Sequence, residues 1–291
     1  MPSIPFTKMH GLGNDFIVVS EFAPHPPLKL SPQIARAWCD RRFGIGADQI
    51  LVVGPAAQAQ SQAQSQAHSK MEIWNSDGTT AEMCGNGIRA VALYLFDHAP
   101  DGLRGRSSYL IETGAGVLEV FIEEMGEGRE VRVNMGPPRV LADRPEKLET
   151  PLGVFEFWEV NMGNPHAVFF VPQGESLDEL ELEKIGPVIE KHPRFPKRTN
   201  VEFVQVLQVG GPGRIRVRVW ERGAGITLAC GTGACASAVA TIQANCAGSP
   251  GVPLEVILPG GKLRLSWDGK KTGPVWMTGP ALEVFSGVLT S

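Results

Sequence analysis

Short runs of β-branched, aromatic and other apolar residues recur along the whole chain, and glycine or proline commonly lies between them. The sequence contains 34 glycines and 23 prolines, which favour tight turns between short elements rather than a bundle of long helices. Apolar runs of this length and composition are typical of β-strands. We therefore expect strands at residues 16–19, 50–53, 71–74, 117–122, 154–157, 167–171, 201–204 and 254–258.

Two further patterns predict other regular elements. The apolar residues Ile215, Val217 and Val219 alternate with three arginines, and this period of two indicates a strand with one buried face. Ser31 followed by Pro32 indicates a helix N-terminus, because serine caps the first turn and proline fits the first helical position. We expect another helix over residues 177–192.

The segment Pro55–Ser69 differs from the rest of the chain, because it consists almost entirely of alanine, glutamine and serine. It offers little apolar surface to offset chain entropy, so we expect a mobile surface insertion between two strands. An exposed polar helix is the alternative, because alanine and glutamine favour helix. Neither form is expected to carry chemistry.

One internal repeat joins a cysteine to a glycine-rich segment. Residues 83–90 read MCGNGIRA, and residues 229–236 read ACGTGACA. Cys230 follows Cys84 by 146 residues, which is half the length of the 291-residue chain. Both copies continue into small and apolar residues that suit a helix. The repeat predicts two similar halves, each with a cysteine at the start of a helix.

A cysteine directly before a helix lies among backbone N–H groups that have no partner within the helix. These groups and the helix dipole favour the thiolate, and they can lower a thiol pKa from about 8.5 to roughly 3.5–7.5. The glycines allow a bound group to approach the backbone closely, so the same N–H groups could hold a carboxylate. Two such sites, related by pseudosymmetry, are expected to face each other across a cleft between the halves.

This arrangement suits the inversion of a carbon that carries hydrogen. A thiolate removes the proton from one face, and a thiol delivers a proton to the other. The α-proton of an amino acid is weakly acidic, so the carbanion needs preorganised donors, which helix N-termini supply. The repeat therefore predicts a racemase or epimerase that needs no prosthetic group. The alternative is that Cys84 and Cys230 merely pack at two helix starts.

Composition and charge narrow the possible partners. The chain carries 27 Lys and Arg against 31 Asp and Glu, and this formal net charge of −4 argues against a nucleic-acid partner. No apolar run approaches the length of a membrane span, and no secretory signal is recognisable. Five cysteines, an odd number without such a signal, argue against a disulfide framework. We expect a small-molecule substrate, no membrane association and a cytoplasmic location.

Three other classes of protein fit the sequence less well. A thiol–disulfide oxidoreductase would need a Cys-x-x-Cys pair, which the sequence lacks. A zinc module would need paired ligands, and Cys230, Cys235 and the remote His166 do not have that spacing. The glycines at 11–13 and 44–46 lack the third glycine of a dinucleotide-binding fingerprint.

Eight short motifs follow one another along the chain. Together, and in this order, they indicate a protein family far more specifically than any one of them does. In chain order they are GLGNDF at 11–16, GIGADQ at 44–49, NSDG at 75–78, EMCGNG at 82–87, GNPH at 163–166, TN at 199–200, ERGAG at 221–225 and ACGTG at 229–233. With these motifs the chain resembles the diaminopimelate epimerases over essentially its whole length, except for the insertion Pro55–Ser69.

The resemblance implies an enzyme that interconverts LL- and meso-2,6-diaminopimelate for lysine, and often peptidoglycan, synthesis without pyridoxal phosphate or metal. It implies an α/β fold of the mainly antiparallel α+β kind, with two pseudosymmetric domains that each wrap a curved sheet around a central helix. The expected domains are residues 1–128 plus 279–291, and residues 129–278, because a strand near 282–285 should return to the first domain. A homodimer is also implied.

The resemblance further assigns roles to single residues. It makes Cys84 and Cys230 the acid–base pair and places Glu221, Gln49 and His166 around the reacting ammonium group or the thiols. The backbone that holds the α-carboxylate is assigned to Gly85, Asn86, Gly231 and Thr232. The distal end of the substrate is assigned to Asn14, Asn75, Asn164, Asn200 and Arg222.

The chemistry of diaminopimelate agrees with this set, because the molecule carries a second amino-acid group. Arginine binds a carboxylate through two hydrogen bonds, and asparagine offers both a donor and an acceptor. Plainer roles stay open: Asn14 and Asn75 as turn residues, Glu221 with Arg222 as a solvated ion pair, and His166 as a loop histidine. The remaining cysteines are expected to pack in the structure, namely Cys39, Cys235 and Cys246.

The second candidate among isomerases is an enzyme like proline or hydroxyproline racemase, which shares the two-cysteine chemistry. Its substrate has one carboxylate and no distal amino-acid group. Such an enzyme would not need Arg222 together with a set of asparagines, so the sequence favours the epimerase.

Overall fold

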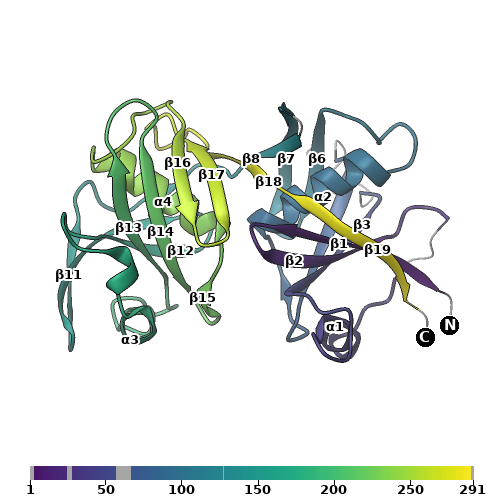
Figure 1. Ribbon diagram of the computed structural model, residues 1–291, viewed down its shortest axis with the longest axis horizontal. Helices are drawn as coiled ribbons and strands as arrows, with labels where there is room; N and C mark the ends of the chain where they lie inside the picture. The colour runs from purple at the N-terminus through teal and green to yellow at the C-terminus, as the bar shows by residue number, and fades with distance from the viewer. Residues whose placement is uncertain (1–2, 25–27, 57–66, 127, 290–291) are drawn as a thin grey trace. The chain divides into compact units, whose positions relative to one another are not determined.

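The computed structural model describes residues 3–24, 28–56, 67–126 and 128–289 of the chain. Contacts divide the chain into two compact units, Met1–Val133 with Gly279–Ser291, and Asn134–Thr278. Each unit combines a mainly antiparallel sheet with helices (Figure 1), so the predicted fold class is confirmed. The change between units falls after residue 133, and the predicted domain limits at residues 128 and 279 stay a prediction.

The first unit contains most of the N-terminal half and the last strand of the chain. Its elements are β1 (Ile4–Gly11), β2 (Asn14–Ser20), α1 (Pro32–Cys39), β3 (Gln49–Gly54), β4 (Ser69–Asn75), β5 (Thr80–Ala81), α2 (Gly85–His98), β6 (Ser108–Thr113), β7 (Gly116–Met125), β8 (Gly128–Asn134) and β19 (Leu282–Leu289).

The sheet of the first unit runs in the order β19, β1, β2, β3, β4, β6, β7, β8. Two neighbouring pairs are parallel, β2 with β3 and β4 with β6, and the others are antiparallel. The predicted return of the C-terminal strand is confirmed, because β19 pairs with β1 from Ile4 opposite Leu289 to His10 opposite Leu282.

The second unit repeats this plan. Its elements are β9 (Arg139–Val140), β10 (Glu146–Thr150), β11 (Gly153–Asn161), β12 (Pro165–Phe170), the 3₁₀ helix η2 (Leu177–Glu179), α3 (Leu182–Glu190), β13 (Asn200–Gln208), β14 (Arg214–Glu221), β15 (Gly225–Thr227), α4 (Gly231–Gln243), β16 (Leu254–Leu258), β17 (Gly261–Ser266) and β18 (Trp276–Pro280).

The strand order of the second unit shows that the internal repeat is structural. The strands follow the order β10, β11, β12, β13, β14, β16, β17, β18. The parallel pairs are β12 with β13 and β14 with β16, which correspond to the two parallel pairs of the first unit. The two helices also have equivalent places along the chain. Helix α2 follows the short strand β5 and precedes β6, and helix α4 follows the short strand β15 and precedes β16.

Both repeat helices are buried against their own sheets. In α4 all residues from Gly233 to Ile242 are buried, and the helix contacts β11, β12, β13, β16 and β17. In α2 the residues from Gly85 to Leu93 are buried. Small and apolar side chains on every face allow a helix to be surrounded by other structure, so each half has the central helix that was predicted.

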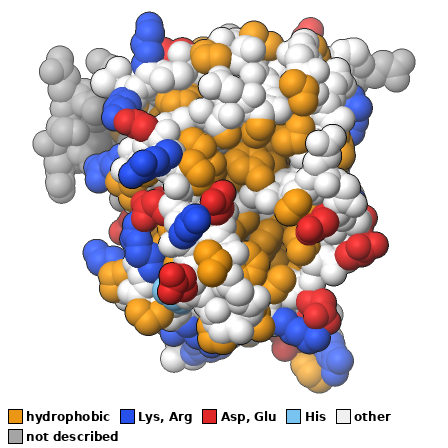
Figure 2. All heavy atoms as spheres, turned by 90° about the vertical axis from the view of Figure 1, so that its left-hand side faces the viewer, with side chains coloured by type: hydrophobic (Ala, Val, Ile, Leu, Met, Phe, Trp, Pro, Cys, Tyr) orange, Lys and Arg blue, Asp and Glu red, His pale blue; other side chains and the backbone are white. Residues whose placement is uncertain are grey.

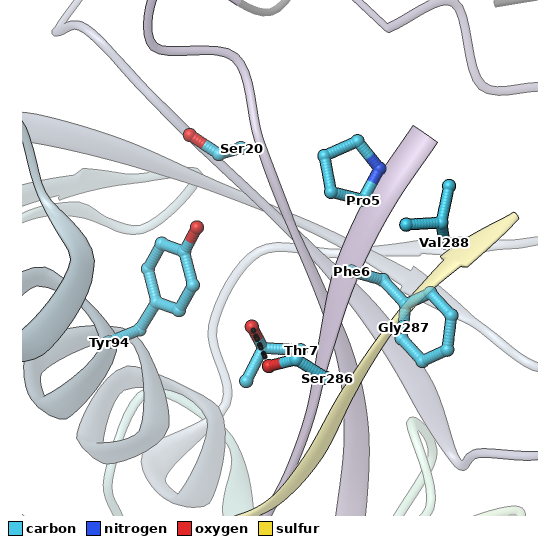
Figure 3. Close-up of a pocket in the computed structure, with 8 residues that line it drawn as sticks. All are labelled: Pro5, Phe6, Thr7, Ser20, Tyr94, Ser286, Gly287 and Val288. Atoms are coloured by element: carbon cyan, nitrogen blue, oxygen red, sulfur yellow. Dashed lines mark hydrogen bonds between the residues drawn. The ribbon is translucent and has the colours of Figure 1, made fainter. Parts of the chain in front are cut away.

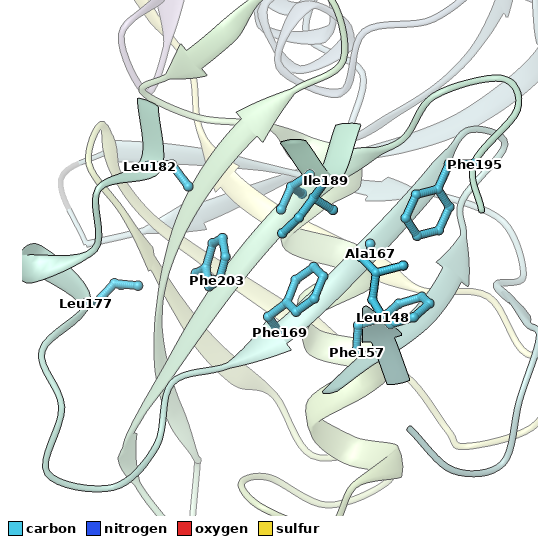
Figure 4. Close-up of a cluster of buried hydrophobic side chains, with 10 residues drawn as sticks. Leu148, Phe157, Ala167, Phe169, Leu177, Leu182, Ile189, Phe195 and Phe203 are labelled. Atoms are coloured by element: carbon cyan, nitrogen blue, oxygen red, sulfur yellow. The ribbon is translucent and has the colours of Figure 1, made fainter. Parts of the chain in front are cut away.

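A large apolar cluster supports the second unit. Phe169 stacks on Phe203 with ring centroids 5.2 Å apart, and Phe157 stacks on Phe169 at 5.7 Å (Figure 4). Leu182 and Ile189 of α3 belong to the same cluster. This packing holds the strands β12 and β13, which carry site residues described below.

The prediction of one continuous helix over residues 177–192 is wrong, because this segment contains two separate helices. These are η2 and the shorter helix α3, with Leu180 in an extended conformation between them. The guanidinium of Arg218, on β14, donates hydrogen bonds to the carbonyl oxygens of Leu177 at 3.0 Å and Leu180 at 3.1 Å. These carbonyl groups have an external partner, so the backbone does not need to continue as one helix.

Other sequence predictions can be compared directly with the structure. The cap of α1 is confirmed, because Ser31 Oγ accepts a hydrogen bond from the Ile34 N–H at 3.3 Å. Most of the insertion lies outside the described residues, at 57–66. Its last residue, Ser69, begins β4, and beside it His68 Nδ1 accepts a hydrogen bond from the Leu110 N–H at 3.1 Å.

Among the described residues, no helix is both long enough and apolar enough to span a membrane. On the face of the molecule in Figure 2, acidic and basic side chains are intermixed with apolar ones. Charge of neither sign forms one continuous patch on that face.

Candidate functional site

Cys84 is the N-cap residue of α2. Its backbone is extended, and its Sγ accepts a hydrogen bond from the Gly87 N–H at 3.3 Å. The first intrahelical bond runs from the Ile88 N–H to the Cys84 carbonyl, so the amides of Gly85 and Asn86 lie ahead of it. A sulfur at this position receives both a direct donor and the positive end of the helix dipole.

A polar network surrounds Cys84 within the first unit. The Cys84 thiol donates to Asn14 Oδ1 at 3.7 Å, and Asn86 Nδ2 donates to the same oxygen at 3.3 Å. At the far ends, Asn14 Nδ2 donates to Asp48 Oδ2 at 2.9 Å, and the guanidinium of Arg89 donates to Asn86 Oδ1 at 2.9 Å. A carboxylate can only accept and a guanidinium can only donate, so both amides are fixed with Asn14 Oδ1 toward the sulfur.

Gln49 and Asn75 lie opposite each other on β3 and β4. Gln49 Nε2 donates to Asn75 Oδ1 at 2.8 Å, and Asn75 Nδ2 donates to Thr79 Oγ1 at 2.9 Å. These two predicted site residues therefore form a pair of their own, and both are only partly buried.

Cys230 has the same place in the second unit, as the N-cap of α4. Its Sγ accepts a hydrogen bond from the Gly233 N–H at 3.3 Å, the distance found at Cys84. The Thr232 hydroxyl lies 3.6 Å from the Cys230 sulfur. The local sequence explains this geometry, because in both copies a cysteine precedes the small residues that begin a helix.

The charge environment of Cys230 corrects the expectation that this helix N-terminus favours the thiolate. Burial raises the pKa of the Cys230 thiol well above its usual range, and the nearby carboxylates of Glu221 and Glu202 raise it further. Hydrogen bonds from Thr232 and the Gly233 N–H act in the opposite direction but are outweighed. Cys230 is therefore held as a thiol.

Glu221 lies at the end of β14 next to this thiol. Burial raises the pKa of the Glu221 carboxyl, while hydrogen bonds from Thr227 and Cys230 lower it. Thr227 Oγ1 donates to Glu221 Oε1 at 2.7 Å. Glu221 is thus a partner of the thiol, and the alternative of a solvated pair with Arg222 is not what the structure contains.

His166 is fully buried on β12 and is bonded on both sides of its ring. Nδ1 lies 2.7 Å from Glu202 Oε1, and Nε2 lies 2.9 Å from Asn164 Oδ1. Asn164 Nδ2 in turn donates to Thr232 Oγ1 at 3.2 Å. This chain of contacts connects His166 with the N-terminus of α4. His166 is thus a hydrogen-bonded strand residue, and it does not lie in a loop.

Asn200, the first residue of β13, and Arg222, which follows the last residue of β14, are neighbours. The Arg222 backbone N–H donates to Asn200 Oδ1 at 2.9 Å, and Asn200 Nδ2 donates to the Pro165 carbonyl at 2.9 Å. The Arg222 guanidinium donates to the Lys197 carbonyl at 3.3 Å and is exposed. A ligand in solution can therefore reach it.

The structure thus collects the predicted residues into groups within each unit. In the first unit, Cys84, Asn14 and Asn86 form one group, and Gln49 with Asn75 forms a second. In the second unit, the groups are Cys230 with Glu221, Thr232, Asn164 and His166, and Asn200 with Arg222. The packing role expected for Cys39 and Cys235 is confirmed by their burial, while Cys246 is only partly buried.

Three residues of these networks were missed at the sequence level: Asp48, Arg89 and Glu202. Two of them had a readable signal, because Arg89 is the one charged residue in 85–96 and Glu202 the one charged residue in 200–206. A charged side chain in an otherwise apolar element is rarely buried without a partner, and both are fully buried. Asp48 had no comparable signal, since it lies at the end of a glycine-containing turn segment and not within an apolar element.

Comparison with known proteins identifies the family. A family model for diaminopimelate epimerase matches residues 6–141 and 158–284. The diaminopimelate epimerase of Synechococcus sp. (strain JA-3-3Ab) is 47% identical over 302 residues, which cover 99% of each chain. That of Thioalkalivibrio sulfidiphilus is 41% identical over 294 residues, which cover 98% of each chain.

Solved structures of lower identity share the fold. A phenazine biosynthesis protein of the PhzF family from Bacillus anthracis matches with a TM-score of 0.71 at 14% identity over the full length of both chains. A probable proline racemase from Agrobacterium radiobacter matches with a TM-score of 0.69 at 17% identity, over 99% of this chain and 93% of its own. At these identities the structures establish the fold alone, whereas the sequence matches show that the chain belongs to the diaminopimelate epimerase family.

Proposed function

We propose that this chain interconverts LL- and meso-2,6-diaminopimelate, with Cys84 and Cys230 as the two acid–base groups. The observation that carries the proposal is the repeated geometry of the two cysteines. Each caps a helix, and each sulfur accepts a hydrogen bond from the N–H three residues later at 3.3 Å. One carbon is inverted when two such groups act on its opposite faces.

The protonation of Cys230 defines where the proposed cycle starts. Because burial and two carboxylates keep Cys230 as a thiol, it begins as the proton donor. Cys84 begins as the base once its thiol has released its proton to solvent. Cys84 takes the α-proton and Cys230 delivers its own proton to the other face of the carbanion. The protein then holds a Cys84 thiol, which has Asn14 Oδ1 as acceptor, and a Cys230 thiolate, which has the Gly233 N–H as donor. The reverse reaction exchanges the roles.

The remaining polar groups suit the two ends of the substrate. The amides at the first two positions of α2 and α4, at Gly85, Asn86, Gly231 and Thr232, provide donors for the α-carboxylate. The exposed guanidinium of Arg222, beside Asn200, is proposed to bind the distal carboxylate through two hydrogen bonds. The product is a precursor of lysine, and we place the reaction in the cytoplasm.

Exchange of the α-proton with solvent tests this function. The purified chain, incubated in deuterated water with LL-diaminopimelate and no added cofactor, should incorporate α-deuterium and form the meso isomer. Because each proton is delivered from a thiol that equilibrates with water, product formed early should carry deuterium. Mass spectrometry with chiral separation measures both quantities. Turnover of proline instead of diaminopimelate would favour the racemase-like alternative.

We also propose that two copies of the chain associate through β19. Among the described residues β19 has one partner strand, β1, and it presents exposed Leu282, Val284, Phe285 and Val288. Beside it, a hollow of about 390 Å³ is lined by residues of β1, β2, α2 and β19 (Figure 3). An unpaired edge with exposed apolar side chains favours pairing with a second copy.

Sedimentation velocity tests this association. The parent chain should sediment at twice its mass of 31.3 kDa, and Val284→Asp should shift it to the single mass. A charge on β19 would have to be buried in the interface, which costs several kcal/mol. Val154→Asp is the matched control, because Val154 is a similarly exposed strand valine in the other unit, 62% against 57%. The β19 interface is refuted if both variants behave alike.

A further inference from the structure

A buried acid–base pair lies against the start of α4, and one of its members has no role in the proposed function. Glu202 and His166 are both 0% exposed, and Glu202 Oε1 lies 2.7 Å from His166 Nδ1. The same oxygen would lie 2.8 Å from a Cβ placed on Gly233. Gly233 is the residue whose N–H bonds the Cys230 sulfur. Glu202 is therefore packed directly against the segment that holds the catalytic thiol.

The first unit shows that this fold does not require an ionisable pair there. His166 lies opposite Asn200 in the parallel pair of β12 and β13, as Phe16 lies opposite Gln49 in β2 and β3. Glu202 follows Asn200 by two positions, as Leu51 follows Gln49. A Cβ on Gly87 would meet the Leu51 side chain at 3.3 Å, as one on Gly233 would meet Glu202. The corresponding residues Phe16 and Leu51 are fully buried and apolar.

Complete burial determines how many protons the pair holds. A buried pair with a net charge would be strongly destabilised, so Glu202 and His166 together must be neutral. Burial also raises the pKa of the Glu202 carboxyl, which agrees with a proton shared between the two groups. A neutral pair carries two protons. When one of them is shared across the 2.7 Å contact between Oε1 and Nδ1, the other lies on Nε2. The Nε2–H then donates to Asn164 Oδ1.

The direction of this hydrogen bond determines the next ones. With its oxygen toward His166, the Asn164 amide group donates through Nδ2 to Thr232 Oγ1 at 3.2 Å. Thr232 Oγ1 accepts that bond, and its own hydrogen is free to point at the Cys230 sulfur, 3.6 Å away. The chain of donors therefore runs from Glu202 through His166, Asn164 and Thr232 to the thiol.

From this geometry we propose that Glu202 is a positioning residue, which fixes the ring of His166 so that the Thr232 hydroxyl donates to Cys230. This inference rests on the proposed function, in which Cys230 gives up its proton. The thiolate that remains then has a second donor besides the Gly233 N–H. Hydrogen bonds to a thiolate stabilise it most when it forms, so this chain assists proton delivery rather than substrate binding.

Substitutions of Glu202 separate positioning from packing. Glu202→Leu copies the residue of the first unit and leaves Nδ1 without a partner, so kcat should fall at least tenfold while KM stays within about threefold. Glu202→Gln can donate its amide N–H to Nδ1 and leave Nε2–H in place, so it should restore most of the rate. A merely structural role predicts that Glu202→Leu is fully active under conditions where circular dichroism shows it folded, and that result would overturn the proposal.

The other end of the chain gives an independent check. Thr232→Val removes the donor to the sulfur, and its combination with Glu202→Leu should lose no more activity than the worse single variant. The losses of activity caused by two substitutions do not add when the residues act through one network, whereas they do add when the residues have separate roles. Additive losses would contradict the inference.

A readout without substrate distinguishes failure of this inference from failure of the proposed function. In ¹⁵N-labelled parent protein, NMR should show a slowly exchanging ring Nε2–H that is absent in His166→Phe. The signal should persist in Glu202→Gln and be lost or exchange rapidly in Glu202→Leu. A parent whose Nε2 carries no proton would refute the inference, whereas a parent that shows the signal but does not turn over diaminopimelate would refute only the function.

Discussion

Replacing Cys84 or Cys230 with serine is expected to abolish epimerisation while the fold stays intact. Serine keeps an acceptor at the N-cap, so the hydrogen bond from Gly87 or Gly233 can still form and helix stability should change little. A hydroxyl is a far weaker acid than a thiol, so it can neither take nor give the α-proton at a useful rate. Loss of a general acid or base costs about 10²- to 10⁴-fold, and we expect kcat to fall by about 10³-fold or more.

The control for this experiment is Cys39→Ala, which removes a thiol from the core of the first unit. Burial raises the pKa of Cys39 to about 11, so this thiol is inert at neutral pH. The variant should turn over within a few-fold of the parent. Rates are best measured as formation of the meso isomer from LL-diaminopimelate, with thermal unfolding of each variant in parallel. A serine variant that turns over like the parent would rule out the two-cysteine mechanism.

The second large effect is expected from Arg222→Lys, which keeps the positive charge but loses the planar fork. Lysine cannot make two parallel hydrogen bonds to one carboxylate, so the distal end of diaminopimelate should be held less well. A hydrogen bond to a charged group contributes about 1.5–3 kcal/mol. Loss of one such bond should lower kcat/KM roughly 10- to 100-fold, because a tenfold change in kcat/KM corresponds to about 1.4 kcal/mol.

Arg216→Lys is the matched control for Arg222→Lys. Arg216 lies in β14, the strand that Arg222 directly follows. It forms a surface ion pair with Asp178, with N–O distances of 2.7 Å. Surface ion pairs contribute little, so kcat/KM should change by less than a few-fold. Equal effects of the two substitutions would show that Arg222 acts through general charge and not through binding of the distal carboxylate.

The repeated plan of this protein could be predicted from the amino-acid sequence alone. Local patterns were sufficient for strands such as β14, where Ile215, Val217 and Val219 are buried and the arginines between them are not. They were also sufficient for the position of both cysteines, because a cysteine followed by small residues at a helix start leads to an N-cap whatever surrounds it. The eight motifs then indicated the family, because their residues and their order can be read from the amino-acid sequence without a structure.

Features that depend on contacts between distant parts of the chain could be seen only in the three-dimensional structure. The interruption between η2 and α3 depends on Arg218, which is 38 residues beyond Leu180 and reaches its carbonyl from another strand. The two copies of the cysteine motif share the Cys-Gly-x-Gly core, yet Cys230 is held as a thiol by burial and by the carboxyl groups of Glu221 and Glu202, which β14 and β13 bring to it. Desolvation and charge depend on what lies around a group in space, and a local motif does not contain that information.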